Sequence, residues 1–303
     1  MRRSTPEDPR IAMPSEARSR AERGTKAARP VSRLLKFAIG LVFYGLSEAW
    51  RILMRLVGKY PPPTAVAIYY HHVLDEDREA IKRQLDHLVR WTTPLPAHIS
   101  QPLQPGLRYS IVTEDDGWKS FADNAIPELK ARNIPVALFA ISDRLGQSIN
   151  GIAFDRLITP DELRALKHEM LTVGSHTASH PSVPTLSDAE ASYELRQSRD
   201  KLTDILRVDI KLFCFPYGAY NQRLISMCRD AGYERVFTCM AELAKPSGFV
   251  TGRVRVDPTD WPLEFHLKLM GAYRWEPAAI ALKRLILSVI RESVRRVTLL
   301  PRL

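Results

Sequence analysis

The sequence places acidic and imidazole side chains directly after apolar runs that are typical of β-strands. Asp115 and Asp116 end one such run, and His176 and His180 follow another. Two imidazoles four residues apart can turn toward one ion if the backbone makes a helical turn, and a carboxylate beside them completes the donor set of a catalytic metal site. These residues therefore indicate metal-assisted hydrolysis, provided that both strand ends lie at one edge of the fold.

Two other strand ends carry residues that could serve the same site. Pro216 and Gly218 fix a bend that leaves Tyr217 near the rim, and His71 and His72 follow the first predicted strand as candidate proton donors. Taken singly, each motif has a commoner structural explanation, such as a turn at Asp-Gly, a pair of hydrogen-bonded loop histidines or a packed tyrosine ring. Their joint occurrence at successive strand ends favours catalysis.

The elements that must position these residues alternate between strand and helix. Strands are predicted at residues 66–70, 109–113, 136–141, 171–175, 210–215, 235–239 and 253–256. Helices are predicted between them, at residues 81–89, 121–129, from 159 onward, 187–206 and 221–231. Such alternation implies a parallel sheet wrapped by helices, either a barrel or a doubly wound sheet, and both folds collect ligands at the carboxyl ends of their strands.

Composition limits the kind of metal site. The chain has 303 residues, 45% of them hydrophobic, so it can bury a large core. Its three cysteines are odd in number and lack C-x-x-C spacing, which argues against a disulfide framework and against a thiolate zinc site. Any metal is therefore expected on histidine and carboxylate ligands.

Positive charge is concentrated at the two ends of the chain. Residues 1–60 contain 13 Lys/Arg and 5 Asp/Glu, and residues 281–303 contain 6 Lys/Arg and 1 Glu, whereas residues 61–280 are slightly acidic. This pattern fits an anionic membrane surface better than nucleic acid, for which no interleaving of aromatic and basic residues is found. We therefore expect no nucleic-acid partner.

These patterns divide the chain into four segments. Residues 1–30 are predicted to be a disordered basic arm, 31–60 an apolar or amphipathic helix, 61–277 the α/β domain and 278–303 a basic amphipathic helix. The uncharged stretch 37–47 is shorter than the roughly 20 residues that span a bilayer. We expect an interfacial helix or a signal-like anchor, with a helix packed on the domain as the alternative. A cytoplasmic or cytoplasmic-membrane location is favoured, and periplasmic exposure stays open.

Taken in order, the motifs resemble those of the polysaccharide deacetylase family, also called the NodB-homology family, over about residues 65–270. Thr113-Glu114-Asp115-Asp116-Gly117 resembles Thr-Phe-Asp-Asp-Gly, His176-Thr177-Ala178-Ser179-His180 resembles His-Ser/Thr-x-x-His, and Phe215-Pro216-Tyr217-Gly218 resembles the Pro-Tyr motif. Tyr70-His71-His72-Val73 resembles the early Tyr-His-Asp-Val of permuted poly-N-acetylglucosamine deacetylases. The resemblance implies an irregular (β/α)7-like barrel with parallel strands, and the segments above place an amphipathic helix at each end.

The resemblance also implies roles for the motif residues. It assigns Asp116, His176 and His180 as ligands of a divalent metal, most commonly zinc. Asp115 would be the general base and His71 the general acid. The backbone N–H of Tyr217, next to Pro216, would stabilise the oxyanion. The implied reaction is hydrolysis of the N-acetyl group of an N-acetylglucosamine-containing oligo- or polysaccharide, such as a chitooligosaccharide, with release of acetate from a linear amide.

Departures from the family pattern leave two roles open. Cys214 stands where many members have an arginine that orients the base, so this role is expected to pass to Arg253 or Arg255, beside Asp257. Glu114 replaces the usual aromatic residue and adds a third adjacent carboxylate.

The general acid has two rivals to His71. His72 is adjacent to it, and His266 is the nearest late candidate for the family's Leu-x-His motif, although its surroundings predict a helix flank. A catalytically impaired glycan-binding or scaffolding protein of the same fold is the alternative to an enzyme.

Overall fold

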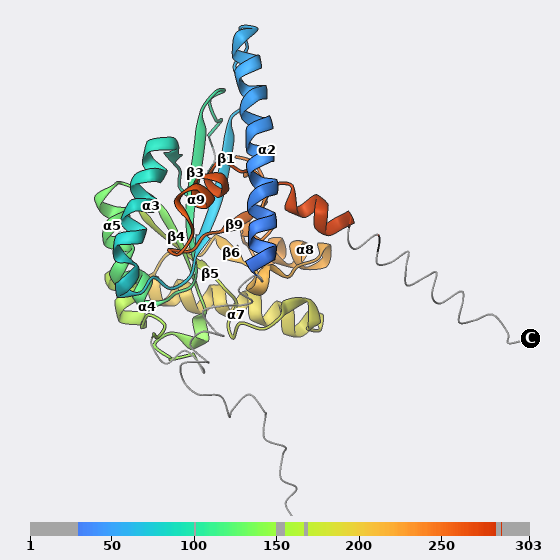
Figure 1. Ribbon diagram of the computed structural model, residues 1–303. Coiled ribbons are helices and arrows are strands. Elements are labelled where there is room, and N and C mark those ends of the chain that lie inside the picture. The colour runs from blue at the N-terminus through green and yellow to red at the C-terminus, as the bar shows by residue number, and fades with distance from the viewer. Residues whose placement is uncertain (1–29, 100, 150–154, 167–168, 283–285, 287–303) are drawn as a thin grey trace, which may run out of the picture.

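The computed structural model describes residues 30–99, 101–149, 155–166, 169–282 and 286. Within them, the chain forms a parallel sheet wrapped by helices (Figure 1). The strands are β1 (Thr64–Tyr70), β2 (Thr93–Pro94), β3 (Arg108–Asp116), β4 (Val136–Ala140), β5 (Leu171–Ser175), β6 (Leu212–Cys214), β7 (Arg235–Phe237), β8 (Val250–Thr251) and β9 (Arg253–Arg255). Seven lie where the sequence predicts strands, whereas β2 and β8 are too short to leave a recognisable pattern.

The sheet curls into an irregular barrel because its two edge strands are consecutive in the chain. Its order is β8-β7-β6-β5-β4-β3-β1-β9, with β2 beside β3, and these pairs are parallel. Only Gly252 separates β8 from β9 at the opposite edge. A Cβ at Gly252 would lie 2.2 Å from the Met240 carbonyl oxygen, so the chain needs glycine to pass from one edge to the other. The predicted (β/α)7-like barrel is confirmed.

The helices cover the outside of the sheet. They are α2 (Pro30–Leu56), α3 (Arg78–Trp91), α4 (Lys119–Asn124), α5 (Ile126–Ala131), α6 (Pro160–Ala165), α7 (Asp188–Leu206), α8 (Gln222–Asp230) and α9 (Pro262–Leu269). Thr159 and Ser187 begin α6 and α7 with capping boxes. The helix predicted at 121–129 is two helices, because Pro127 lies in the first turn of α5, where proline has no N–H to lose.

Alternation along β3 separates its acidic side chains. Ile111 packs in the cluster inside the barrel, and Asp115 shares its face because successive strand residues point to opposite sides. Val112 packs in the cluster between sheet and helices, and Glu114 shares that face. The strand therefore directs Asp115 into the barrel and Glu114 toward the helices.

Helix α2 contacts the barrel through ion pairs and through the Phe37 and Tyr44 rings, and it exposes an apolar face. Arg33 Nε donates to Glu264 at 3.0 Å, Lys36 pairs with Glu276 at 2.9 Å, and Glu48 pairs with Arg108. The exposed side carries large hydrophobic residues, namely Leu34, Leu35, Ile39, Leu41, Val42, Leu46, Trp50, Ile52, Leu53 and Leu56. Ser32–Leu56 has the length and composition to cross a membrane. In Figure 1, α2 lies beside α9.

The predicted C-terminal helix, residues 278–303, begins within the described part of the chain, where residues 276–282 are helical. The basic residues of its predicted polar face, Lys283, Arg284, Arg291 and Arg295, lie outside them, as do residues 1–29 of the predicted basic arm.

Candidate metal and catalytic site

The carboxyl ends of β3 and β5 bring the two principal motifs together. Asp116 ends β3, and His176 follows β5. Asp116 Oδ1 lies 3.5 Å from His176 Nε2 and 3.4 Å from His180 Nε2. The three ligand atoms can therefore surround one point.

This geometry fits a metal ion. Two ligands of a tetrahedral zinc ion, each about 2.0–2.1 Å from it, lie about 3.3 Å apart. The observed separations between the Asp116 oxygen and the imidazole nitrogens are close to this value. His176 Nδ1 lies 2.8 Å from the Cys214 carbonyl oxygen, to which only a protonated nitrogen can donate, so Nε2 keeps its lone pair for an ion. The donor set and its orientation thus suit a divalent cation.

The imidazoles are kept neutral, as ligands must be. Burial lowers the pKa of His176 to about 4, against the opposing effect of Asp115. Burial and then Arg144 lower the pKa of His180 to about 4. Both rings are therefore unprotonated near pH 7 and available to a cation.

Asp115, His176 and Cys214 form a second group of possible ligands, but its atoms are engaged elsewhere. Both carboxylate oxygens of Asp115 accept hydrogen bonds from Arg253, at 2.7 and 2.8 Å. Burial raises the pKa of the Cys214 thiol well above its usual value, which opposes the thiolate that a metal needs. Asp116 with the two imidazoles is the better site.

Arg253 holds Asp115 from the far edge of the sheet. It lies on β9, is buried, and donates to Asp115, to Thr113 Oγ1 at 2.8 Å and to the Thr238 carbonyl oxygen at 3.3 Å. Its Nη2 lies 2.8 Å from Cys214 Sγ. Arg253, with His176 nearby, lowers the pKa of Asp115 well below its usual range, despite the opposing effect of burial. Asp115 is therefore ionised and fixed in orientation near pH 7.

The other two candidates for orienting Asp115 interact with each other instead. Arg255 Nη2 lies 3.8 Å from Asp257 Oδ2, and the Asp257 carboxylate also accepts from the backbone N–H and hydroxyl of Thr259. Both side chains are only partly buried. Of the three, Arg253 is the residue that the structure joins to Asp115.

His71 lies within electrostatic reach of both aspartates. Burial lowers its pKa, and Asp116 and Asp115 oppose that shift. Its Nδ1 is buried and has no hydrogen-bond partner among the described residues, so the ring offers a polar atom that a substrate could use. His72 packs edge-on against Trp118, with 5.9 Å between ring centroids.

His266 belongs to a different cluster. Its Nδ1 lies 2.8 Å from His87 Nε2, and its Nε2 lies 3.1 Å from Tyr44 Oη. These contacts join α9 to α3 and α2, as expected of a histidine on a helix flank.

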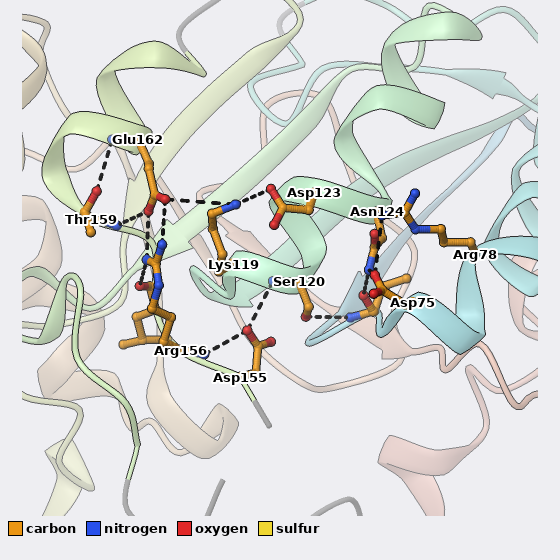
Figure 2. Close-up of polar contacts among 12 residues, drawn as sticks. Asp75, Arg78, Lys119, Ser120, Asp123, Asn124, Asp155, Arg156, Thr159 and Glu162 are labelled. Atoms are coloured by element: carbon orange, nitrogen blue, oxygen red, sulfur yellow. Dashed lines mark hydrogen bonds and ion pairs between the residues drawn. The ribbon is translucent and has the colours of Figure 1, made fainter. Parts of the chain in front are cut away.

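The loop that carries His71 and His72 is fastened to α4. The Val73 N–H donates to Ser120 Oγ at 3.2 Å, and Asn124 Nδ2 donates to the Val73 carbonyl oxygen at 2.8 Å. The Ser120 N–H in turn donates to Asp155 at 3.2 Å, and Figure 2 shows this chain of contacts beside the ion pair of Arg156 and Glu162. The network limits the movement of both histidines.

Left-handed backbone is concentrated at the site. Asp116, Thr177, His180 and Tyr217 all have positive φ, between 60° and 84°. Such angles cost side-chain-bearing residues roughly 1–3 kcal/mol each and are typical of functional sites. Tyr217 follows Pro216 in a short 3₁₀ helix, Pro216–Gly218, and its exposed ring packs on His180 with 4.8 Å between centroids. The bend thus places Tyr217 beside the His180 imidazole.

Glu114 is directed away from Asp115, as alternation along β3 requires. It is fully buried and accepts the backbone N–H groups of Gly117 and Trp118, at 3.0 Å each. Burial raises its pKa well above the usual value, Asp116 and Asp115 add to the shift, and the two backbone hydrogen bonds oppose it. Trp118 Nε1 also donates to Asp116 Oδ2, at 3.1 Å, which orients the carboxylate. Glu114 therefore shapes the turn after β3.

Glu194 is a supporting residue that the sequence analysis does not identify. It lies on α7 and accepts from the N–H groups of Ala178 and Ser179, at 2.8 and 2.9 Å, and from Ser179 Oγ at 2.6 Å. These bonds hold the turn between the two imidazoles. The one sequence signal is an acid on the buried stripe of α7, beside Leu195.

The fold is a parallel α/β barrel, and two carboxylates and two imidazoles lie at its carboxyl rim. Enzymes with such barrels carry their active sites at this rim, and these side chains suit metal-assisted hydrolysis. Residues 105–236 match the family described as polysaccharide deacetylase.

Two proteins named as deacetylases are similar to this chain in sequence, and two solved structures share its fold. A Bacillus subtilis protein named as a polysaccharide deacetylase is 20% identical over 65% of this chain and 73% of its own length. A chitin deacetylase of Colletotrichum lindemuthianum is 30% identical over 36% of this chain, which spans only 41% of that protein. The structure of IcaB from Ammonifex degensii shares the fold, with a TM-score of 0.61 and 22% identity over 70% of this chain and 98% of that one. A deacetylase from Streptococcus pyogenes, PplD, gives 0.58 and 18%, over 69% and 99%.

Proposed function

We propose that this protein is a metal-dependent N-deacetylase that removes acetyl groups from N-acetylglucosamine units of an oligo- or polysaccharide and releases acetate. The observation that carries the proposal is the ionised Asp115, held at both oxygens by Arg253, beside the group of Asp116, His176 and His180. A base and a cation site then lie on the same rim. The match of residues 105–236 to the polysaccharide deacetylase family supports the substrate class.

Each side chain has a role in this reaction. A divalent cation, which we propose is zinc held by Asp116, His176 and His180, would polarise the acetamide carbonyl and acidify a water molecule. Asp115 would accept the proton of that water. The backbone N–H of Tyr217, positioned by Pro216, would donate to the carbonyl oxygen as negative charge develops on it. His71 would deliver a proton to the amine, since an amide nitrogen is a poor leaving group as an anion.

The replacement of an arginine by Cys214 does not favour the alternative of a glycan-binding protein without activity. Arg253 occupies the space beside Cys214 and supplies both hydrogen bonds to Asp115. Glu114 is likewise occupied by backbone N–H groups. Both departures from the family pattern thus have local compensation.

Two neighbouring aspartates provide the test. Acetate release from N-acetylated chitooligosaccharides and metal content would be measured for the wild type, Asp115→Asn and Asp116→Asn. We expect Asp115→Asn to lose at least a hundredfold in turnover while it keeps its metal, because a general base contributes about 10²–10⁴. Asp116→Asn should lose the metal as well. Full turnover in Asp115→Asn would exclude the mechanism, and glycan binding without acetate release by the wild type would favour the binding protein.

We further propose that the exposed apolar face of α2 lies on the cytoplasmic membrane. Contact in the membrane plane is favoured over a span because Arg33, Lys36 and Glu48 are paired with charged residues of the domain. If α2 spanned the bilayer with these pairs intact, the charged domain residues would have to enter it too. Fractionation with and without high salt tests this placement. Protein recovered in the soluble fraction under both conditions would contradict it.

A further inference from the structure

A groove lined by arginines lies at the end of the barrel opposite the metal ligands. It has a volume of about 300 Å³ between the last turns of α2, the end of α3 and the segment before β3. Four arginines line it, namely Arg51, Arg55, Arg90 and Arg108. Arg108 begins β3 and Asp116 ends it, so the groove lies about 25 Å from the candidate metal site at roughly 3.3 Å per strand residue. The groove is therefore separate from the candidate metal and catalytic site.

The positive charge of the groove is poorly balanced. Glu48 pairs with Arg108, whereas Arg51 donates to backbone carbonyls, to Gly106 at 2.9 Å and to Pro62 at 3.4 Å. Within the described part of the chain, Arg55 and Arg90 form no ion pair with a carboxylate. Burial and then the neighbouring Arg108 lower the pKa of Arg51. An anion in the groove would therefore relieve repulsion among fixed cations.

The surroundings of the groove are apolar and exposed, which distinguishes it from a site for a soluble anion. Val89, Trp91 and Leu107 line the groove and are each about two-fifths exposed. On α2, Leu53 and Leu56 lie in the same last turns as Arg51 and Arg55, and both are exposed. Cations beside exposed aliphatic and aromatic side chains are the composition of a surface that lies at the headgroup level of a bilayer.

We propose that this groove binds the phosphate group of an anionic phospholipid when the apolar face of α2 lies on the membrane. The proposal rests on the membrane placement proposed above. The groove would add selection for anionic lipid to a contact that the apolar face alone would make with any bilayer. Arginine suits this ligand because its guanidinium can donate two parallel hydrogen bonds to phosphate oxygens.

Flotation of the full-length protein with vesicles tests the proposal. The probes are vesicles of phosphatidylcholine alone and of phosphatidylcholine with phosphatidylglycerol, each with and without inorganic phosphate. The test variant is Arg55→Gln/Arg90→Gln, and the control is Arg83→Gln/Arg207→Gln, which removes the same charge from exposed positions outside the groove. Thermal unfolding of both variants would check that they fold.

We expect the test variant to lose about thirtyfold in affinity for anionic vesicles, because each arginine at such a surface contributes about 1 kcal/mol. The control variant should lose less than about threefold, and neutral vesicles should bind the wild type and both variants alike. An equal loss in test and control would show diffuse charge and overturn the proposal.

Two further outcomes separate the possible ligands. Wild-type protein that binds both vesicle types equally would keep the membrane placement and overturn the phosphate site. Displacement from anionic vesicles by inorganic phosphate at constant ionic strength would show a site for free phosphate and would also overturn the proposal. Binding to neither vesicle would contradict the membrane placement itself.

Discussion

The carboxyl and amino ends of the sheet both gather charged side chains, but they hold them in opposite ways. At the carboxyl end, Asp115 and Arg253 are buried and joined by two hydrogen bonds. At the amino end, Arg55 and Arg90 are exposed around an open groove. A buried pair fixes direction at the cost of desolvation, whereas exposed cations keep their charge available to a partner. The first arrangement suits chemistry, and the second suits attraction.

Removing one arginine from each end should give the largest difference. Arg253→Met is expected to lower the free energy of unfolding by about 3–5 kcal/mol, because it leaves Asp115 charged, buried and unpaired. Arg90→Met should change it by less than about 0.5 kcal/mol. Denaturant titration would measure both. Similar small losses for the two variants would contradict the contrast between the ends.

Arg253→Lys separates orientation from charge. Lysine keeps the positive charge but cannot hold both oxygens of Asp115. We expect this variant to regain much of the stability lost in Arg253→Met and to deacetylate at least about tenfold more slowly than the wild type. Turnover equal to the wild type would show that the pair acts on stability alone.

Glu114 tests whether a buried carboxylate at the same rim can be purely structural. Glu114→Gln keeps the size but replaces one of the two carboxylate oxygens that accept the Gly117 N–H by an NH2 donor. The expected loss is about 1–3 kcal/mol in unfolding free energy. Metal content should be unchanged, and a loss of metal would contradict the position assigned to Glu114.

The imidazole pair under α2 should be visible in the pH dependence of stability. Burial, then the neighbouring His87 and then Arg108 lower the pKa of His266 to about 4, and Glu48 opposes the shift. The unfolded chain takes up this proton near pH 6.5 and the folded chain does not, so stability should fall as pH drops from about 6.5 to 4. His266→Gln should reduce that fall by about 1 kcal/mol, a value discounted for partial solvent contact. Denaturant titrations at several pH values compare the two slopes.

The smallest expected effect is at a left-handed residue outside the site. Arg207 ends α7 with φ of 55°, a conformation that glycine adopts without strain. Arg207→Gly should raise the free energy of unfolding by about 0.5–1 kcal/mol and leave acetate release unchanged. Thermal unfolding and the activity assay would check both, and a destabilised variant would contradict the strain.

The sequence pattern predicted a parallel sheet wrapped by helices and the residues at its rim, because both depend on short-range pattern. The choice of a barrel over a doubly wound sheet came from the family resemblance. Apolar runs fix the strands, and parallel strands deliver Asp116, His176 and His180 to one edge. Partner choice at long range was less predictable. Arg253 and Arg255 share a face of β9 by alternation, and only the depth of each in the barrel decides which one reaches Asp115.

The role of Glu194 and the packing of α2 could not be predicted from the sequence pattern, because both depend on contacts between distant parts of the chain. Glu194 bonds a loop some fifteen residues before it in the chain, and nothing local marks that contact. For α2, the sequence left an interfacial helix, an anchor and a packed helix open. Its basic side chains Arg33 and Lys36 pair with Glu264 and Glu276, which lie more than two hundred residues away in the chain.

The left-handed backbone conformation at Thr177 would affect the outcome of laboratory evolution. A β-branched residue at φ of 68° is strained, and local hydrogen bonds from the Ser142 and His180 N–H groups to its carbonyl and hydroxyl oxygens keep it there. A library selected for heat resistance alone would drift toward glycine at this position. The turn between the two imidazoles would then be less rigid, and the selected variants would have higher thermal stability and lower turnover.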